Sequence, residues 1–455
     1  MQFIQEIVSM IGGFVWGPVM ILFLVGTGLF LTIRFKFIQF TGFGHALGLL
    51  TGKYDDPEDT GDITHFQALS AALSATIGTG NIAGVATAIA SGGPGAVFWM
   101  WITALVGMAT KFTSCLLSQK YRKVNEQGIV SGGPMYYLEH GLGQKWLGVL
   151  FALFTVIASF GIGNMVQANS VAEPLYDILN VPKWITGTVL ALLVAMVILG
   201  GIRRIAVVAG KIVPLMVILY VGGALIILFH HIDQILPTLK LIVEKAFTPT
   251  AAIGGFTGAT VMQTVRFGVA RGIFSNESGL GSAPIAHAAA KTKEPVREGL
   301  VASVGPFIDT IVVCTMTALI IVLSGLWHNV DGTGAQLTGA TLSARAFESG
   351  IPFGQYIISF GLVFFAFSTI LAWSYYGDRS AEYLFGSKAV KPYRWLWVII
   401  VPIGATSQLD VVWNLSDAAN GLMAIPNLIG LIGLSGVVAA ELKDYLSREH
   451  KPYGQ

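Results

Sequence analysis

The chain has 455 residues, of which 54% are hydrophobic and only 11% are charged, and its formal net charge is +2. Soluble domains carry roughly 25% charged residues, so this composition excludes an ordinary water-soluble fold. The basic residues are scattered among short loops rather than clustered, which argues against nucleic acid as a partner. We therefore expect an all-α integral membrane protein that lies in the lipid bilayer.

The chain begins with MQFIQEIVSM. This stretch has neither a basic leading region nor a small-residue cleavage site, so we expect mature protein leading into a first span rather than a signal peptide. Cys115 and Cys314 both lie in apolar runs. We expect them to be free, buried thiols with no disulfide framework.

Hydropathy predicts eleven transmembrane helices, most of them near the ~20-residue length that crosses a bilayer. In chain order the predicted spans are 14–33, 64–90, 95–119, 147–170, 184–200, 212–230, 256–290, 299–324, 354–378, 395–411 and 416–440. The second and the seventh are too long and too rich in glycine and serine to be plain helices. We expect both to be interrupted.

The lysines and arginines test this layout. Twenty of the 27 lie in loops that follow odd-numbered spans or in the C-terminal tail. The loops after even-numbered spans hold only four, which are Lys183, Lys240, Lys245 and Arg345. By the positive-inside rule, the odd-following loops and the C-terminus are cytoplasmic, and the N-terminus is outside.

Each interrupted span opens a group of five helices. The first group, 64–230, starts from the cytoplasm and the second, 256–440, starts from outside, so their topologies are opposite. Residues 1–63 then form an extra N-terminal transmembrane helix with a cytoplasmic loop, and residues 441–455 form a cytoplasmic tail. Two inverted five-helix repeats, each opened by a broken helix, are typical of secondary transporters.

The first interruption lies within 74–84, SATIGTGNIAG. Its glycines can unwind the helix, and the freed backbone groups must then line a cavity or bind a ligand. The N–H groups of Thr79 and Gly80 would begin the outer half-helix, where unpaired donors suit a carboxylate. Carbonyls before the break, with the side chains of Thr76 and Asn81, would offer oxygen ligands to a monovalent cation. The alternative is a stripe of small residues for close helix packing.

The second interruption lies within 271–284, RGIFSNESGLGSAP. Such a polar, glycine-rich stretch ahead of a proline does not suit a lipid-facing helix. Carbonyls freed along Phe274, Ser275 and Asn276 would receive a substrate ammonium. Glu277 at membrane depth is a functional candidate. The alternative is a structural role, in which it pairs with Arg271 or caps donors of the broken helix.

Other polar or aromatic residues at membrane depth are Asn164, Gln167, Ser368, Thr369 and Trp373. The two amides would face a pocket or join helices to one another. The two hydroxyls would bind a cation or bond to their own helix. The tryptophan would wall a small-substrate pocket or serve in packing. Two mid-span charges, Lys111 and Asp309, have no partner that the sequence identifies, and structural pairing is the default for both.

Motifs of soluble enzymes and of ATP-driven pumps are absent from the sequence: it has no Walker A motif, CxxC pair, HExxH or GxSxG. We therefore expect a carrier that is not an enzyme and that is driven by an ion gradient. Two alternatives stay open. One is a cation channel or antiporter in which Glu277 and Asp309 titrate, and the other is a non-transporting amino-acid sensor on the same scaffold.

Several stretches resemble the alanine or glycine:cation symporter family. They are GGPGAVFWMWITALVG (92–107), ATIGTGNIAG (75–84), GGPMY (132–136), FSNESGLGS (274–282) and FIDT (307–310). The resemblance covers about residues 10–440. It implies a leucine-transporter-type fold with an extra N-terminal helix. It also implies symport of L- or D-alanine or glycine with sodium, or with protons, in the inner (plasma) membrane of a prokaryote. No obligate protein partner is evident.

The resemblance also implies roles for single residues. The N–H groups of Thr79 and Gly80, next to Asn81, would hold the substrate carboxylate. Gln167 and Trp373 would keep the cavity small. A sodium ion would be held by carbonyls and hydroxyls from two spans, which are those of Ser74, Ile77, Ser368 and Thr369. A second sodium would fall at Thr76 and Asn81.

Overall fold

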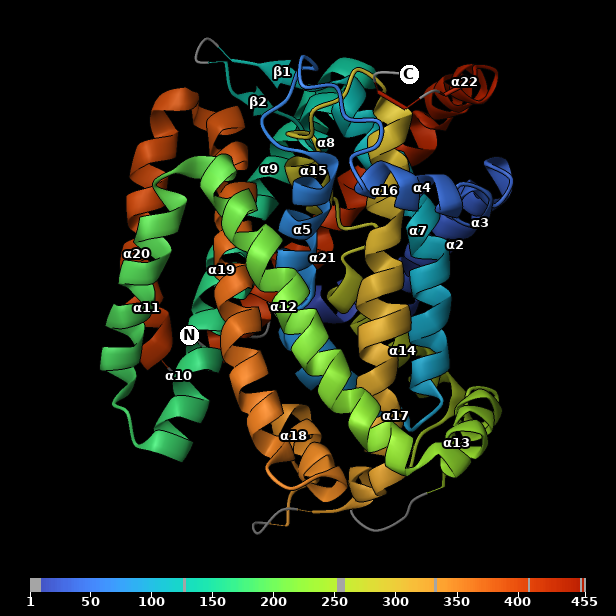
Figure 1. Cartoon of the computed structure of the whole chain (residues 1–455), viewed down its shortest axis with the longest axis vertical. Coiled ribbons are helices and arrows are strands. Elements are labelled where there is room, and N and C mark those ends of the chain that lie inside the picture. The colour runs from blue at the N-terminus through green and yellow to red at the C-terminus, as the bar shows by residue number, and fades with distance from the viewer. Residues whose placement is uncertain are drawn as a thin grey trace.

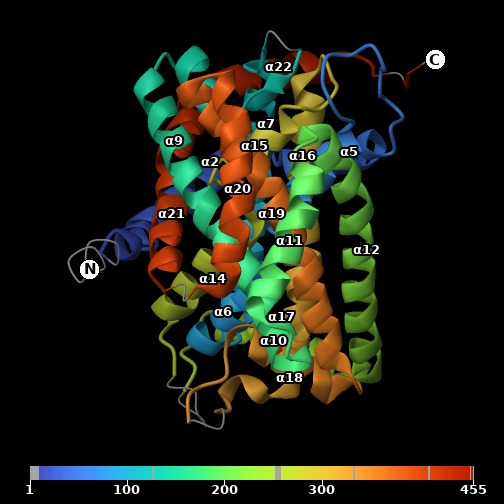
Figure 2. The ribbon, with the colours of Figure 1, turned by 90° about the vertical axis from the view of Figure 1, so that its left-hand side faces the viewer.

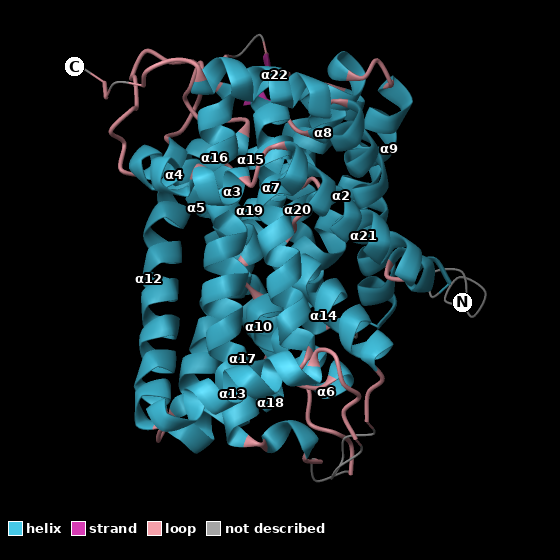
Figure 3. Cartoon of the chain, turned by 90° about the vertical axis from the view of Figure 1, so that its right-hand side faces the viewer, coloured by secondary structure: helices cyan, strands magenta, loops and turns pink. Residues whose placement is uncertain are grey.

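The computed structural model describes residues 10–125, 128–251, 258–330, 334–407, 410–450 and 452–453. Residues 1–9, on which the expectation of mature protein without a signal peptide rests, and the first two residues of the seventh predicted span lie outside these ranges. The described chain is almost entirely helical, with loops concentrated at the two ends of the bundle (Figure 3). A two-stranded antiparallel sheet pairs β1 (Lys123–Val124) with β2 (Val130–Ser131). Cys115 and Cys314 are free and buried, as predicted.

The α-helices before the second break are α2 (Pro18–Arg34), α3 (Ile38–Thr41), α4 (Phe43–Leu50), α5 (His65–Thr76), α6 (Val85–Gly92), α7 (Ala96–Lys120), α8 (Pro134–Tyr136), α9 (Lys145–Ala158), α10 (Val166–Leu179), α11 (Lys183–Ile198), α12 (Gly201–His230), α13 (Ile232–Lys245) and α14 (Val261–Asn276). Those after it are α15 (Ala283–His287), α16 (Pro295–Pro306), α17 (Thr315–Ser324), α18 (Gly339–Gly350), α19 (Gly354–Phe385), α20 (Val390–Thr406), α21 (Asp410–Gly433) and α22 (Ser435–Leu446).

Short π-helical and 3-10 segments join several of these helices. The π-helical ones are η1 (Gly80–Gly84), η2 (Tyr137–Gly141), η3 (Ser159–Met165) and η4 (Phe307–Cys314), and the 3-10 ones are η5 (Leu326–His328) and η6 (Ser387–Ala389). The π segments η3 and η4 lie inside continuous apolar runs, α9–η3–α10 and α16–η4–α17. Single π turns of this kind are frequent at functional sites.

Six helical runs are long and apolar enough to cross a membrane: Ala96–Lys120, Lys145–Tyr176, Gly201–His230, Pro295–Ser324, Gly354–Phe385 and Asn414–Gly433. The helices His65–Thr76 and Gly80–Gly92 together are long and apolar enough to form one span, which bends by 52° at its break. Two shorter apolar helices are Pro18–Arg34 and Lys183–Ile198. The multispan architecture and the first interruption are therefore confirmed, and the count of eleven stays a prediction.

The bundle has two distinct ends (Figure 1). One end carries the sheet, α4, α22 and the C-terminus, and we call it the C-terminal face. The other end carries α13 and α18, two helices that the sequence analysis left in loops, and we call it the α13–α18 face. Figure 2 shows α11, α12, α19 and α20 running between the two ends. The breaks of the two interrupted helices lie between these faces.

Both broken helices begin in the same way. Thr64 caps α5 by accepting from the N–H of Gln67 at 3.2 Å, while the Gln67 side chain accepts from the N–H of Thr64 at 3.0 Å. Thr260 and Gln263 form the same reciprocal pair at α14, at 3.3 and 2.9 Å. Each capping box satisfies two backbone donors that would otherwise be orphaned at the helix start. The two helices thus share a Thr-x-x-Gln start as well as a glycine-rich end.

Candidate functional site

The two breaks are packed directly against each other. A Cβ placed on Gly80 would lie 3.0 Å from the Cα of Ser275, and one placed on Gly78 would lie 3.0 Å from the Thr369 hydroxyl. A side chain at either glycine would force the neighbouring groups apart. Glycine therefore permits the backbone of the first break to approach both α14 and α19.

A small pocket opens where these elements meet. Residues of both breaks, of η3, α10, α19 and α21 line it: Ala75, Thr76, Gly78, Thr79, Gly80, Ile162, Gln167, Phe274, Glu277, Thr369, Trp373 and Asn420. Its volume is about 20 Å³, enough for about one water molecule. The fold thus brings five of the eight predicted substrate residues to one place, namely Thr79, Gly80, Gln167, Phe274 and Trp373.

The wall of this pocket carries both backbone N–H donors and side-chain oxygen acceptors. Thr79 and Gly80 begin the second half-helix, so their N–H groups have no preceding turn to bond. The side-chain carbonyls Gln167 Oε1 and Asn420 Oδ1 are buried and have no hydrogen-bond partner within the described part of the chain. Buried amide oxygens without partners are rare and costly. This arrangement suits a small molecule that carries both an acid and an amine.

Glu277 ends α14 in the left-handed region, at φ 54° and ψ 20°. A non-glycine residue held there stores strain, and such strain is common at functional sites. The carboxylate accepts from the Ser282 hydroxyl at 2.6 Å, across the second break. It also interacts electrostatically with Lys111, which is buried on α7. Arg271, the partner suggested by the sequence, instead lies over the Phe274 ring and acts electrostatically on Asp417.

Three predicted substrate residues do not line the pocket. Asn81 donates to Asp309 Oδ1 at 2.7 Å, and the Ser275 hydroxyl donates to Asp309 Oδ2 at 2.9 Å. Asn276 donates to the Thr310 hydroxyl at 3.2 Å. Asp309 is fully buried on η4. Its side chain accepts a hydrogen bond from one residue of each break, Asn81 of the first and Ser275 of the second. The structure thereby gives Asp309 the partners that the sequence did not identify.

The predicted cation ligands lie side by side across α5 and α19. The Ser74 carbonyl accepts from the hydroxyls of Thr369 and Ser368, at 3.1 and 3.3 Å. Both hydroxyls also lie within bonding distance of the Phe365 carbonyl, at 3.0 and 2.9 Å. Each hydroxyl can therefore donate its proton to the Phe365 carbonyl of its own helix. Its oxygen lone pairs are then free for a cation beside the Ser74 carbonyl. Ile77, another predicted ligand, is buried at the end of α5.

Thr76, proposed for a second cation, lies on the pocket wall, and its hydroxyl is 3.4 Å from the Leu73 carbonyl. Its predicted partner Asn81 is turned toward Asp309. No group of three or more His, Cys, Asp or Glu that could hold a metal occurs among the described residues. A cation here would therefore be bound by carbonyls and hydroxyls, the neutral oxygen ligands that hard cations accept.

Backbone pairing joins the segment before α5 to the segment after α15, and we call this pairing the closure at the C-terminal face. The N–H of Asp62 donates to the Ala289 carbonyl at 2.8 Å, and the N–H of Lys291 donates to the Ile63 carbonyl at 2.7 Å. The Arg122 guanidinium then donates to four carbonyls of the same two segments, those of Thr60, Ala288, Ala290 and Thr292, at 2.6 to 2.9 Å. The entry to α5 is thus fastened to the exit of α15.

Toward the α13–α18 face, a cavity of about 300 Å³ adjoins the pocket through Phe274, which lines both. Its walls come from the N-terminal segment, α14 and α21: Gly12, Gly13, Trp16, Arg266, Phe267, Ala270, Arg271, Phe274, Asn414 and Asp417. Oppositely charged side chains, Arg266 and Arg271 against Asp417, therefore line the approach to the pocket from this face.

Sequence reasoning missed Asn420 and Ile162 as pocket residues and left the role of Glu277 open. Asn420 is an isolated amide in the apolar run of α21, and an intramembrane polar residue is a signal that could have been used. Asn164, which was weighed beside Gln167, donates to the Trp397 carbonyl at 2.9 Å and joins η3 to α20. Ile162 carries no sequence signal, because apolar pocket walls look like ordinary span residues.

Apolar spans with two broken helices that meet at a small central pocket define a secondary membrane transporter. Among solved structures, MhsT in complex with L-phenylalanine has a similar fold, with a TM-score of 0.54 at 12% identity over 85% of this chain and 99% of that chain. The predicted leucine-transporter-type fold is confirmed.

The chain belongs to the sodium:alanine symporter family, whose model matches residues 1–454. It is 52% identical to the sodium/alanine symporter AgcS of Methanococcus maripaludis over 98% of both chains. It is 51% identical to an uncharacterized transporter of Haemophilus influenzae over 98% of this chain and 97% of that one. A probable sodium/glutamine symporter, GlnT of Bacillus subtilis, is 38% identical over 98% of this chain and 91% of that one. The predicted family is confirmed, with sodium as its coupling ion and alanine as its substrate.

Proposed function

We propose that this chain carries alanine and glycine across the plasma membrane of a prokaryote together with sodium, by alternating access to the central pocket. One observation carries the proposal. The first N–H groups of a half-helix, at Thr79 and Gly80, share a pocket with two amide oxygens that have no hydrogen-bond partner among the described residues. A free amino acid presents a carboxylate and an ammonium on one carbon, which matches such a pair of donors and acceptors.

The substrate carboxylate would accept from the N–H groups of Thr79 and Gly80, where the half-helix dipole also favours a negative charge. The ammonium would donate to Gln167 Oε1 and Asn420 Oδ1, for which the described ranges of the chain supply no other donor. Trp373 and Phe274 would close the pocket around a small side chain. Either enantiomer of alanine can present these two charged groups, so we include D-alanine among the substrates.

The close packing of the pocket walls supports a preference for substrates with small side chains. A Cβ on Gly163 would lie 2.3 Å from the Cβ of Trp373, so η3 and α19 are already in close contact behind the indole. The pocket volume of about 20 Å³ must grow to admit even alanine. A side chain as long as that of glutamine would need the indole to move, and we infer that this chain discriminates against it.

Sodium would bind between α5 and α19, at the carbonyls of Ser74 and Ile77 and the hydroxyls of Ser368 and Thr369. Gly78, which follows these carbonyls, contacts Thr369, and the next two residues are the proposed carboxylate donors. A cation that orders the end of α5 would therefore also order Thr79 and Gly80. By linkage, alanine must tighten sodium binding by the same factor.

Alternating access would use the closure at the C-terminal face as one gate. We place this face in the cytoplasm, because the basic loops gather there, and the α13–α18 face and the N-terminus outside. The cavity at Phe274 would then be the outer vestibule. The shared Thr-x-x-Gln start of α5 and α14 supports two inverted repeats, 64–230 and 256–440, whose broken helices move relative to the rest of the bundle.

The deciding experiment is uptake of labelled alanine into proteoliposomes that contain the purified chain, with the sodium gradient, the proton gradient or neither imposed. We expect uptake only with sodium and competition by glycine and D-alanine, with weak competition by glutamine. Uptake driven by a proton gradient alone would show that the coupling ion is the proton and not sodium. Binding of alanine without flux would indicate a sensor. Sodium flux that is indifferent to alanine would indicate a channel or antiporter.

A further inference from the structure

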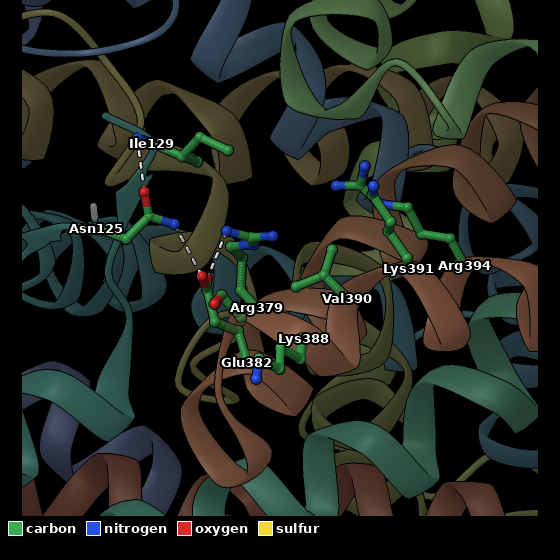
Figure 4. A pocket seen from close by; sticks show the side chains of 9 residues that line it. Asn125, Ile129, Arg379, Glu382, Lys388, Val390, Lys391 and Arg394 are labelled. Atoms are coloured by element: carbon green, nitrogen blue, oxygen red, sulfur yellow. Dashed lines mark hydrogen bonds and ion pairs between the residues drawn. The ribbon is translucent and has the colours of Figure 1, made fainter. Parts of the chain in front are cut away.

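A second cavity, separate from the central pocket, lies at the C-terminal face where α19 turns into α20. Its volume is about 360 Å³. The end of α19, η6, the start of α20 and the β1–β2 turn supply its walls: Asn125, Ile129, Arg379, Glu382, Ser387, Lys388, Val390, Lys391 and Arg394 (Figure 4). Four of these nine side chains are basic and one is acidic.

The arginines and acids of this cavity neutralise one another. Arg379 is 2% exposed and donates to Asp378 at 2.8 Å and to Glu382 at 2.5 Å. Arg394 holds the other oxygen of Asp378 with two bonds, at 2.6 and 2.8 Å. Asn125 and Ser131 also donate to Glu382, at 3.0 and 2.7 Å. Figure 4 shows the bonds of Asn125 and Arg379 meeting at this carboxylate. Both acids are therefore fully used within the cluster.

Two lysines of the wall remain outside this network. Lys388 and Lys391 are exposed, and neither forms an ion pair with any carboxylate in the described ranges. They lie one turn apart, on η6 and the first turn of α20. The cavity therefore carries a net positive charge at its mouth, backed by a rigid arginine and carboxylate network. Such a site attracts a phosphate-type anion.

The apolar neighbours of the lysines point to the source of the anion. Phe385 is 72% exposed just before η6, and Trp395, Leu396 and Ile399 are 55%, 48% and 57% exposed on α20. α20 overlaps the predicted span 395–411, and an exposed apolar flank on such a helix would face lipid chains. An exposed tryptophan next to charged residues is typical of the membrane boundary. A ligand with a phosphate head and long apolar tails fits both the lysine pair and the apolar flank of α20, whereas a free anion would contact only the lysines.

We propose that this cavity binds the head group of an anionic glycerophospholipid, with the phosphate at Lys388 and Lys391 and the acyl chains along α20. Basic pockets between helices at a membrane boundary hold anionic head groups in this way. The site lies on α19, the helix that also carries Ser368, Thr369 and Trp373, but the proposal does not depend on the transport function.

The test is lipid binding to the purified full chain in detergent. Phosphatidylglycerol, phosphatidylcholine and inorganic phosphate are titrated separately, with native mass spectrometry to count bound lipid and with the melting temperature as a second readout. The variant is Lys388→Gln/Lys391→Gln. The matched control is Lys53→Gln/Lys443→Gln, which removes two other exposed lysines of the same face that have no ion pair among the described residues. Lys388→Arg/Lys391→Arg keeps the charge and checks folding.

We expect phosphatidylglycerol to bind and to raise the melting temperature of the natural chain, the control and the arginine variant. The glutamine variant should bind it about 30-fold more weakly, because each lysine near an anionic surface contributes about 1 kcal/mol. Equal binding of phosphatidylglycerol and phosphatidylcholine would overturn the proposal, as would unchanged binding by the glutamine variant. Stabilisation by inorganic phosphate that matches that by phosphatidylglycerol would assign the site to a free anion instead.

Discussion

Asn81 and Asp309 are joined by a hydrogen bond of 2.7 Å between Nδ2 and Oδ1, although 228 residues separate them in the chain. The same carboxylate accepts from Ser275 of the second break at 2.9 Å. One buried acid therefore bonds to both breaks, and residues of both breaks, Thr79, Gly80, Phe274 and Glu277, line the same pocket. The geometry of the pocket rests on this contact.

Asp309→Asn should destabilise the protein. The amide replaces one accepting oxygen by a donor, so at least one of the bonds from Asn81, Ser275 and Thr310 is lost. Hydrogen bonds to a buried charge contribute about 1.5–3 kcal/mol each, so the melting temperature should fall by several degrees. Asp233→Asn, at an exposed aspartate of α13, is the matched control. A melting temperature unchanged from the natural chain would show that Asp309 does not hold the breaks together.

Thr79→Pro should abolish alanine uptake while the protein stays folded. Proline fits the first turn of a helix but removes the N–H that we assign to the carboxylate. Thr79→Ala keeps this N–H and should retain most of the uptake, so the pair separates the backbone donor from the side chain. Uptake in proteoliposomes and the melting temperature are measured for both. Transport by the proline variant at the natural rate would remove Thr79 from the substrate site.

Ser368→Ala/Thr369→Ala should raise the sodium concentration needed for half-maximal uptake at least tenfold, with a smaller effect on the maximal rate, because two oxygen ligands are lost. Ser374→Ala/Ser380→Ala is the control on the same helix. These hydroxyls are buried and bond only to carbonyls of α19 among the described residues, at 2.6 and 2.9 Å. Uptake is measured against sodium at saturating alanine. The same sodium dependence in both variants would count against this cation site.

Trp373→Phe should widen the pocket and let larger neutral amino acids compete. The smaller ring frees space in the pocket that Ile162 and Gln167 also line, and it loses the hydrogen bond between the indole and Glu277. The backbone N–H groups assigned to the substrate carboxylate are kept. We expect glutamine to inhibit alanine uptake more strongly in the variant than in the natural chain, with alanine uptake itself reduced only a few-fold. Tyr375→Phe, two residues away and outside this pocket, is the control. If glutamine competes equally with both proteins, Trp373 does not set the size limit.

Arg122→Ala should loosen the closure at the C-terminal face, because it removes donors from four backbone carbonyls. Hydrogen exchange should then speed up at the amides of 60–63 and 288–292, with smaller effects in α12 or α20. Arg345→Ala, at an exposed arginine of α18 outside these segments, is the control. Exchange in these segments that matches the natural chain would mean that the backbone pairing alone holds the gate.

Several residues that the sequence proposed for the site lie at one pocket, because the signals for them were local. Glycines and polar residues in the middle of apolar runs predicted where the helices break, and Thr79, Gly80 and Trp373 do meet at one pocket. The amphipathic helices α13 and α18 were missed, since their charged residues made them resemble loops. Asn420 was missed because a single amide in an apolar run does not reveal which way it faces.

By itself the sequence determined the membrane class, the charge asymmetry between loops and the positions of both breaks. These follow from the composition of segments of about 20 residues, because a helix of that length spans the hydrocarbon core of a bilayer. Only the tertiary structure decided which polar groups face the pocket and which face one another. Helix rotation and packing set that choice: they turned Asn81 and Ser275 to Asp309, and left the side-chain oxygens of Gln167 and Asn420 without a hydrogen-bond partner among the described residues.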